Sequence, residues 1–143
     1  MRQIDTADWK KVGSIGNAEM YEIAPDILGI VPHLNCIDTE ATARQSLAFQ
    51  DEHWRRRGQR GAAVVFMDPI IDQDSGARSV YANETGESLS TCYALVGETF
   101  FGFAVSAVFT GLSKPGIPTQ VFRRLEDALP FITKMNRERG GAR

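Results

Sequence analysis

The chain has 143 residues, of which 43% are hydrophobic and 24% are charged. These values are typical of a soluble domain with a single core, and they exclude a disordered tail, a collagen-like fibre and a low-complexity segment. Sixteen Lys and Arg residues against eighteen Asp and Glu residues leave a net charge of -2. This balance excludes a basic field over the whole molecule that would gather nucleic acid or an anionic membrane.

The cysteines and the apolar runs indicate a cytoplasmic protein with reduced thiols. Cys36 and Cys92 stand far apart in the sequence, so a disulfide framework is not expected in a domain of this size. The N-terminus lacks the apolar core of a secretory signal. The longest uncharged apolar run, residues 99–113, is shorter than the ~20 residues with which a helix spans a bilayer, so we expect no transmembrane segment.

The first predicted elements are a β-hairpin and a long helix. Residues 20–23 and 27–31 are rich in strand formers and flank a turn. Residues 40–57 contain no Gly or Pro, which predicts a helix. Asp38 or Thr39 is expected to cap its N-terminus.

Two apolar runs and one shorter run predict the later strands. Residues 62–67 are apolar throughout, which is typical of a strand buried on both faces of a parallel sheet. Residues 91–96 repeat this pattern, and residues 119–122 predict the last strand.

Three further helices are predicted between and after these strands. A short one runs to Asn83 and is capped by Asp74 or Ser75. The length of the apolar run favours a helix over residues 99–112, and an amphipathic helix closes the chain at residues 125–132.

Strands alternate with helices after the initial hairpin, which predicts a single-domain α/β fold. Its sheet is mixed and mostly parallel, with about five strands and about four flanking helices. We expect residues 1–18 to form an N-terminal extension, residues 19–136 the domain, and residues 137–143 a polar tail.

Three local patterns carry a resemblance to a known family. In the first pattern, residues 114–122 contain a proline, then a predicted strand that ends in Phe, and an acidic pair and the helix at 125–132 follow. In the second, residues 77–82 combine Ala-Arg with an aromatic residue. The third is the phenylalanine-rich run before the last strand. Over residues 19–136 the chain resembles the STAS-like domains. The likeness is to the stand-alone bacterial branch related to anti-sigma factor antagonists and CRAL-TRIO-type lipid-binding proteins.

The resemblance implies a phosphoacceptor at Ser75, directly after Asp74. A phosphate there would meet unpaired backbone N–H groups at the start of a helix. The chain departs from the family because it lacks a second small hydroxyl residue before Gly76, and because Asp72 and Asp74 crowd the acceptor. The alternative is that Asp74 or Ser75 only caps the helix.

A second candidate is a polar site formed by Asp68, Asp72, Asp74 and Arg78. The aspartates follow the predicted central strand, and open α/β sheets bind ligands at the carboxyl ends of their strands. These carboxylates suit a divalent cation, but the sequence favours turn residues beside Pro69 and Gly76.

Metal binding and catalysis find no other support in the sequence. His33 and Cys36 have H-x-x-C spacing, and Cys92 can approach them if their strands are neighbours. A fourth ligand is missing, so we expect a strand-end histidine and buried thiols. Neither histidine belongs to a recognisable catalytic motif.

The predicted helix over residues 99–112 has too little polar surface for an exposed helix. It is covered by the rest of the domain, by a second copy or protein partner, or by an apolar ligand. The candidate interface or ligand-binding residues are Phe100, Phe101, Val105, Val108, Phe109 and Leu112.

We therefore expect a non-catalytic regulatory or protein-interaction module that forms a homodimer through the apolar helix at residues 99–113. The alternative is a carrier or sensor of a small apolar or lipid-like ligand, and the third reading is a metal-dependent enzyme that uses Asp68, Asp72 and Asp74. We expect no cofactor, no metal, no catalytic residue and no nucleic-acid partner.

Overall fold

A computed structural model describes residues 4–99 and 116–142 of the chain. A central seven-stranded sheet has the order β1-β2-β3-β5-β7-β8, and β9 pairs with β5. Its strands are β1 (Lys10–Ile15), β2 (Ala18–Ala24), β3 (Ile27–Pro32), β5 (Gln59–Phe66), β7 (Ser90–Val96), β8 (Thr119–Phe122) and β9 (Gly141–Ala142). A separate two-stranded sheet consists of β4 (Cys36–Asp38) and β6 (Ile70–Gln73).

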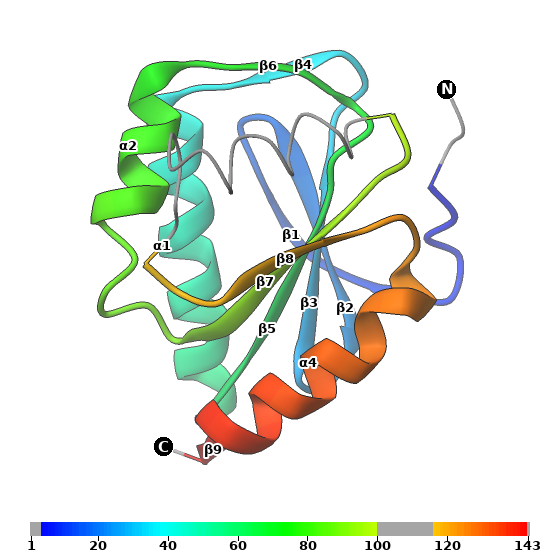
Figure 1. The fold of residues 1–143 in the computed structure, drawn as a ribbon, viewed down its shortest axis with the longest axis vertical. Helices are drawn as coiled ribbons and strands as arrows, with labels where there is room; N and C mark the ends of the chain where they lie inside the picture. Colours follow the sequence, from blue (N-terminus) through cyan, green and yellow to red (C-terminus); the bar gives the residue numbers. More distant parts are fainter. Residues whose placement is uncertain (1–3, 100–115, 143) are drawn as a thin grey trace.

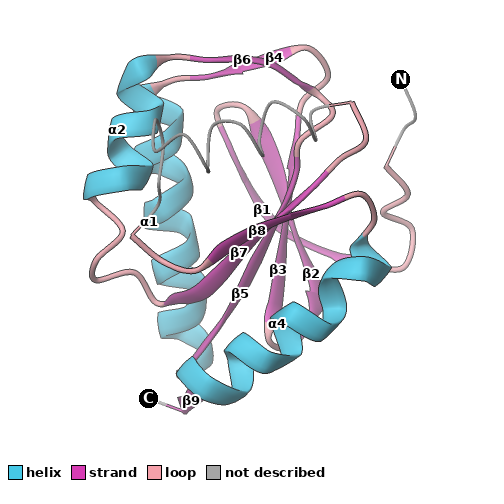
Figure 2. Ribbon diagram, viewed as in Figure 1, coloured by secondary structure: helices cyan, strands magenta, loops and turns pink. Residues whose placement is uncertain are grey.

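Three helices lie within the described residues. They are α1 (Glu40–Arg57), α2 (Ser75–Asn83) and α4 (Leu125–Arg139). Figures 1 and 2 show α1 and α2 on one side of the central sheet and α4 on the other. No helix in these residues combines the length and the apolar character needed to cross a membrane.

The strand directions confirm the predicted fold class. Among the first three strands, β2 runs antiparallel to both of its neighbours, β1 and β3. From β3 onward, β5, β7 and β8 are added in parallel. The molecule is therefore an α/β protein with a mostly parallel sheet that opens with an antiparallel hairpin.

The alternation of side chains along the parallel strands creates two cores. Ala63 of β5 packs on the side of α1 and α2, in a cluster that includes Trp54 and Leu28. Val64 faces the opposite way and packs with Ile132 of α4. Successive strand residues point to opposite faces, so a strand of this kind needs apolar residues at nearly every position, as the sequence predicted for β5.

Trp54 anchors the core on the α1 side. The side chain is fully buried and its Nε1 donates a hydrogen bond to Ser90 Oγ over 3.2 Å. A Cβ added at Gly61 would collide with the indole ring, so only glycine lets β5 approach α1 this closely at that position.

The ends of α1 agree with its sequence signals. Thr39 is the N-cap, and it forms a reciprocal capping box with Thr42. Gly58 ends the helix in the left-handed conformation, with φ of 67°, which glycine adopts without a steric penalty.

The structure differs from the sequence prediction at the chain ends. Residues 1–18 were expected to lie outside the sheet, yet β1 pairs with β2. Residues 137–143 were expected to be a tail, yet Arg139 still belongs to α4 and β9 pairs with β5. The sequence does not reveal β1, because β1 is an edge strand with exposed lysines, and such strands do not show a strong hydrophobic pattern.

Apart from Thr99, the helix predicted over residues 99–112 lies outside the described residues. The other predicted helices are confirmed as α1, α2 and α4, and the strands over residues 62–67, 91–96 and 119–122 correspond to β5, β7 and β8. The strands β4 and β6 were not predicted, because three or four residues are too few to show a periodicity.

Candidate functional site

The starts of α1 and α2 lie side by side beneath the β4–β6 sheet. β4 leads directly into α1, and β6 leads directly into α2. The two strands are parallel, so the helices that follow them begin at the same end, as Figure 1 shows. We call the residues at this junction the helix-start site: Asp38, Thr39, Thr42, Gln73 and Asp74.

Asp38 is the centre of the helix-start site. The residue is 5% exposed, and its carboxylate accepts hydrogen bonds from Thr42 Oγ1 (2.7 Å), Gln73 Nε2 (3.1 Å) and Tyr81 OH (2.9 Å). Burial and the nearby Asp38 carboxylate raise the pKa of Tyr81 far above its ordinary value. Because Asp38 binds donors from α1, β6 and α2, it holds these elements together.

From the sequence, Asp38 is predicted only as a possible helix cap. Thr39 takes that role, and Asp38 acts through contacts up to 43 residues away in the sequence. Only the tertiary structure brings Gln73 and Tyr81 to Asp38, so no local sequence signal identifies it.

Asp74, and not Ser75, caps α2. The Asp74 carboxylate accepts a hydrogen bond from the backbone N–H of Ala77 over 2.8 Å, while Ser75 is the first helical residue. The prediction that one of these two residues caps the helix is confirmed for Asp74. Ser75 is exposed and stays a predicted phosphoacceptor.

The start of α2 is packed tightly against α1. A Cβ added at Gly76 would lie 2.8 Å from Glu40 Cβ and 3.3 Å from Asp74 Oδ1. Ser75 follows Asp74 directly in the chain, so a phosphate on Ser75 would add negative charge next to the Asp74 residue, and like charges repel.

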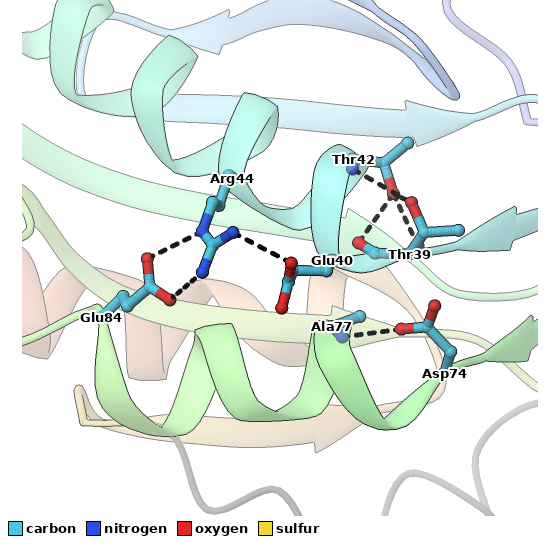
Figure 3. Close-up of polar contacts among 7 residues, drawn as sticks. All are labelled: Thr39, Glu40, Thr42, Arg44, Asp74, Ala77 and Glu84. Carbon is cyan, nitrogen blue, oxygen red and sulfur yellow. Dashed lines mark hydrogen bonds and ion pairs between the residues drawn. The ribbon is translucent and has the colours of Figure 1, made fainter.

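Arg44 links α1 to the other end of α2 (Figure 3). Its guanidinium donates to both carboxylate oxygens of Glu84 over 3.1 and 3.0 Å and contacts Glu40 over 3.0 Å. The hydrogen bonds from Arg44 lower the pKa of Glu84. All three side chains are exposed, so this contact contributes little to stability.

The predicted polar site is divided between two places in the structure. Asp68 follows β5 and accepts hydrogen bonds from Thr99 N and Oγ1 over 2.9 and 2.6 Å. Asp72 lies on β6, and Arg78 donates to the Gln73 carbonyl over 2.7 Å. Within the described residues, no group of three or more His, Cys, Asp or Glu side chains is placed to hold a metal ion.

His33, Cys36 and Cys92 have separate surroundings. His33 Nε2 lies 2.6 Å from Glu19 Oε2. Both cysteines are free thiols, and burial raises the pKa of Cys92 to about 11. This high pKa keeps the Cys92 thiol protonated at neutral pH.

Apolar side chains are exposed around the β4–β6 sheet. Leu34 is 69% exposed, Ile71 62% and Ile37 49%; we call these three residues the apolar cap. Among the described residues the other large exposed hydrophobic side chain is Leu129 of α4, at 40%. The sequence did not predict the apolar cap, because the surrounding residues have the composition of loops. The predicted interface residues Phe100, Phe101, Val105, Val108, Phe109 and Leu112 lie outside the described residues.

The molecule has a STAS-like fold. An uncharacterized protein from the DUF3478 family of Shewanella loihica PV-4, described as having a SpoIIAA-like fold, matches with a TM-score of 0.50. The two chains are 10% identical, and the match covers 91% of this chain and 99% of that chain. At this identity the likeness concerns the fold alone.

The family assignment comes from the sequence. The model of a domain of unknown function, DUF7793, matches residues 21–136, and the chain belongs to this family. The search of curated proteins found no match. The relation to CRAL-TRIO-type proteins stays a prediction.

Proposed function

We propose that this STAS-like domain is a non-catalytic module that binds a protein partner through the apolar cap. The exposure of Leu34, Ile37 and Ile71 carries this proposal. Full burial of one such side chain stabilises a complex by about 1.5 to 3 kcal/mol, and a few apolar anchors of this kind supply most of the binding energy in many interfaces.

The charges beside the apolar cap suggest the chemistry of the partner. Asp72 and Asp74 are both exposed next to it, while the nearby Arg78 donates to a backbone carbonyl. A second copy bound at the same surface would bring acidic residues against acidic residues. We therefore propose a different protein, with apolar residues flanked by Lys or Arg, as the occupant.

The helix-start site supports the apolar cap from below. Asp38 fixes the two strands that carry Ile37 and Ile71, through its own position in β4 and its hydrogen bond to Gln73 of β6. A docking surface held in place before binding loses less conformational entropy when the partner arrives. The three side-chain donors to Asp38 come from α1, β6 and α2, which supports a role for this carboxylate in the architecture.

Photo-cross-linking in cells tests the docking surface. A benzophenone amino acid at position 71 is expected to give a discrete adduct with one protein, whereas the same amino acid at position 129 is the matched control on an exposed Leu of α4. The cross-linked protein, once purified, is expected to bind the unmodified chain and to lose at least about tenfold in affinity for Ile71→Lys. Leu129→Lys is expected to bind normally.

Two outcomes would contradict the docking surface. One is an identical set of adducts from positions 71 and 129, which indicates collisions without a preferred face. The other is unchanged affinity of Ile71→Lys for the cross-linked protein.

Self-association through residues 99–113 is a separate proposal. It is supported by the absence of charged residues from this run, which contains four Phe residues. Sedimentation equilibrium is expected to show a dimer that Phe101→Glu or Phe109→Glu converts to monomer. A monomer before and after the substitution would rule the dimer out.

A further inference from the structure

A pocket lies at the carboxyl ends of β5, β7 and β8, outside the helix-start site. Its volume is about 400 Å³, and Phe66, Val96 and Gly97 from the strand ends contribute to its lining. The N-terminal segment and the start of α4 complete it, and Figure 1 shows this segment (blue) beside the start of α4 (orange). Open α/β sheets bind small ligands at this edge.

One wall of the pocket is aromatic. The ring of Trp9 stacks on Phe66, with centroids 5.4 Å apart and planes at 29°. Trp9 also contacts Tyr21 of β2, with ring centroids 6.1 Å apart. The indole ring is thus held from two sides while it stays partly exposed, and a planar apolar group has a fixed surface on which to stack.

The opposite wall carries positive charge. Arg123 and Arg124 line the pocket between the end of β8 and the start of α4. Arg124 is the N-cap of α4, and its guanidinium, which has donors only, cannot accept a hydrogen bond from the first N–H groups of the helix. Its Nε lies 3.7 Å from Asp127 Oδ2, a long contact at an exposed position.

The acidic residues of the pocket are mostly occupied within the chain. The Asp68 carboxylate accepts two hydrogen bonds from Thr99, and that of Asp5 accepts one from the backbone N–H of Ala7 over 3.0 Å. Glu126 lies in the first turn of α4, where its charge is stabilised by the positive end of the helix. Arg124, whose contact with Asp127 is long and exposed, is therefore the cation of the rim best placed to meet an incoming anion.

We propose that this pocket binds a small aromatic carboxylate. The ring stacks on Trp9 beside Phe66, and the carboxylate is placed at Arg124 and the N-terminal N–H groups of α4, which together recognise an anion. This site differs from the predicted carrier site, which depends on residues 99–113, and from the apolar cap, whose occupant is a protein.

Nuclear magnetic resonance of the full chain with 2-naphthoate tests the proposal. The chain has two tryptophans, so its ¹H–¹⁵N spectrum contains two indole N–H signals, and Trp9→Phe identifies that of Trp9. We expect a saturable shift of the Trp9 signal. The Trp54 signal is the internal control, because this side chain is fully buried and bonded to Ser90.

Matched ligands and variants separate the two halves of the proposal. The neutral 2-naphthylmethanol is expected to bind the original chain at least about tenfold more weakly than 2-naphthoate does. The double variant Arg123→Gln/Arg124→Gln is expected to bind 2-naphthoate at least about tenfold more weakly than the original chain does. Both changes remove charge-assisted hydrogen bonds. Arg137→Gln, at the other end of α4, is expected to bind 2-naphthoate normally. An unshifted Trp9 signal, equal affinity for the alcohol, or unchanged affinity of the double variant would overturn the proposal.

Discussion

The helix-start site and the pocket both lie where parallel strands end, but they satisfy their polar groups differently. In the helix-start site, Asp38 accepts three hydrogen bonds from its own chain and is nearly excluded from solvent. The pocket beside β5, β7 and β8 is hollow and has arginines on its rim. The Asp38 carboxylate is bonded from within the chain, so only the apolar exterior of that region is left for binding, whereas the pocket is a hollow with room for a ligand.

This contrast underlies the two proposals, in which the apolar cap is a surface for a protein and the pocket is a site for a small molecule. The apolar cap is exposed and small, and it gains from burial against a partner. The pocket has about 400 Å³, within the range of sites for small ligands. The two proposals thus assign two different modes of binding to separate surfaces of one domain.

The largest expected effect comes from breaking the saturated cluster. Asp38→Ala removes the acceptor of Thr42, Gln73 and Tyr81, and we expect it to lower the free energy of unfolding by about 2 to 4 kcal/mol. Urea denaturation measures this change. Asp72→Ala is the control, because Asp72 is exposed on β6, and a loss of equal size in both variants would contradict the central role of Asp38.

A smaller effect is expected at the start of α2. Asp74→Ala removes the N-cap and is expected to cost about 1 kcal/mol of unfolding free energy. Ser75→Ala is expected to change it by less than about 0.5 kcal/mol, because the Ser75 side chain has no capping role. If thermal denaturation shows the reverse order, Ser75 and not Asp74 stabilises the helix.

The smallest expected effect lies outside both regions and depends on pH. Burial, followed by the charge of Arg57, lowers the pKa of His53 below its ordinary value of 6.5. The unfolded chain then binds this proton more readily, so the stability contributed by neutral His53 is present above pH 6.5 and is lost as the pH falls through the folded pKa.

The substitution His53→Gln is therefore expected to reduce the loss of stability at acidic pH. We expect the melting temperature of this variant to fall less than that of the original chain between pH 7.5 and pH 5.5, as measured by circular dichroism. Parallel curves for the two proteins would mean that other groups cause the acid sensitivity.

The sequence predicted those elements whose signals are local. Thr39 and Gly58 delimit α1 through side-chain capping and a left-handed turn, and both are recognisable without the fold. The apolar run of β5 likewise reports its burial on two faces. The fold class followed from the order of such elements, and the STAS-like resemblance is confirmed at the level of the fold.

The rest depended on contacts between distant segments. Asp38 bonds to Tyr81 across 43 positions, and Trp9 meets Phe66 through the pairing of β1 with the sheet. The polar residues Asp68 and Asp74 stand close in the sequence but contact different segments, Thr99 and Ala77. Spacing along the chain therefore did not reveal which side chains form one site.

The pairing of β1 with β2 sets a boundary for working with this domain. A fragment trimmed to the family match, residues 21–136, would lose β1, Trp9 and the first residues of β2. In the shortened chain, β3 or the remainder of β2 would form an exposed edge strand with unpaired backbone groups, which promotes aggregation. Experiments on either binding surface should therefore retain the residues before position 21.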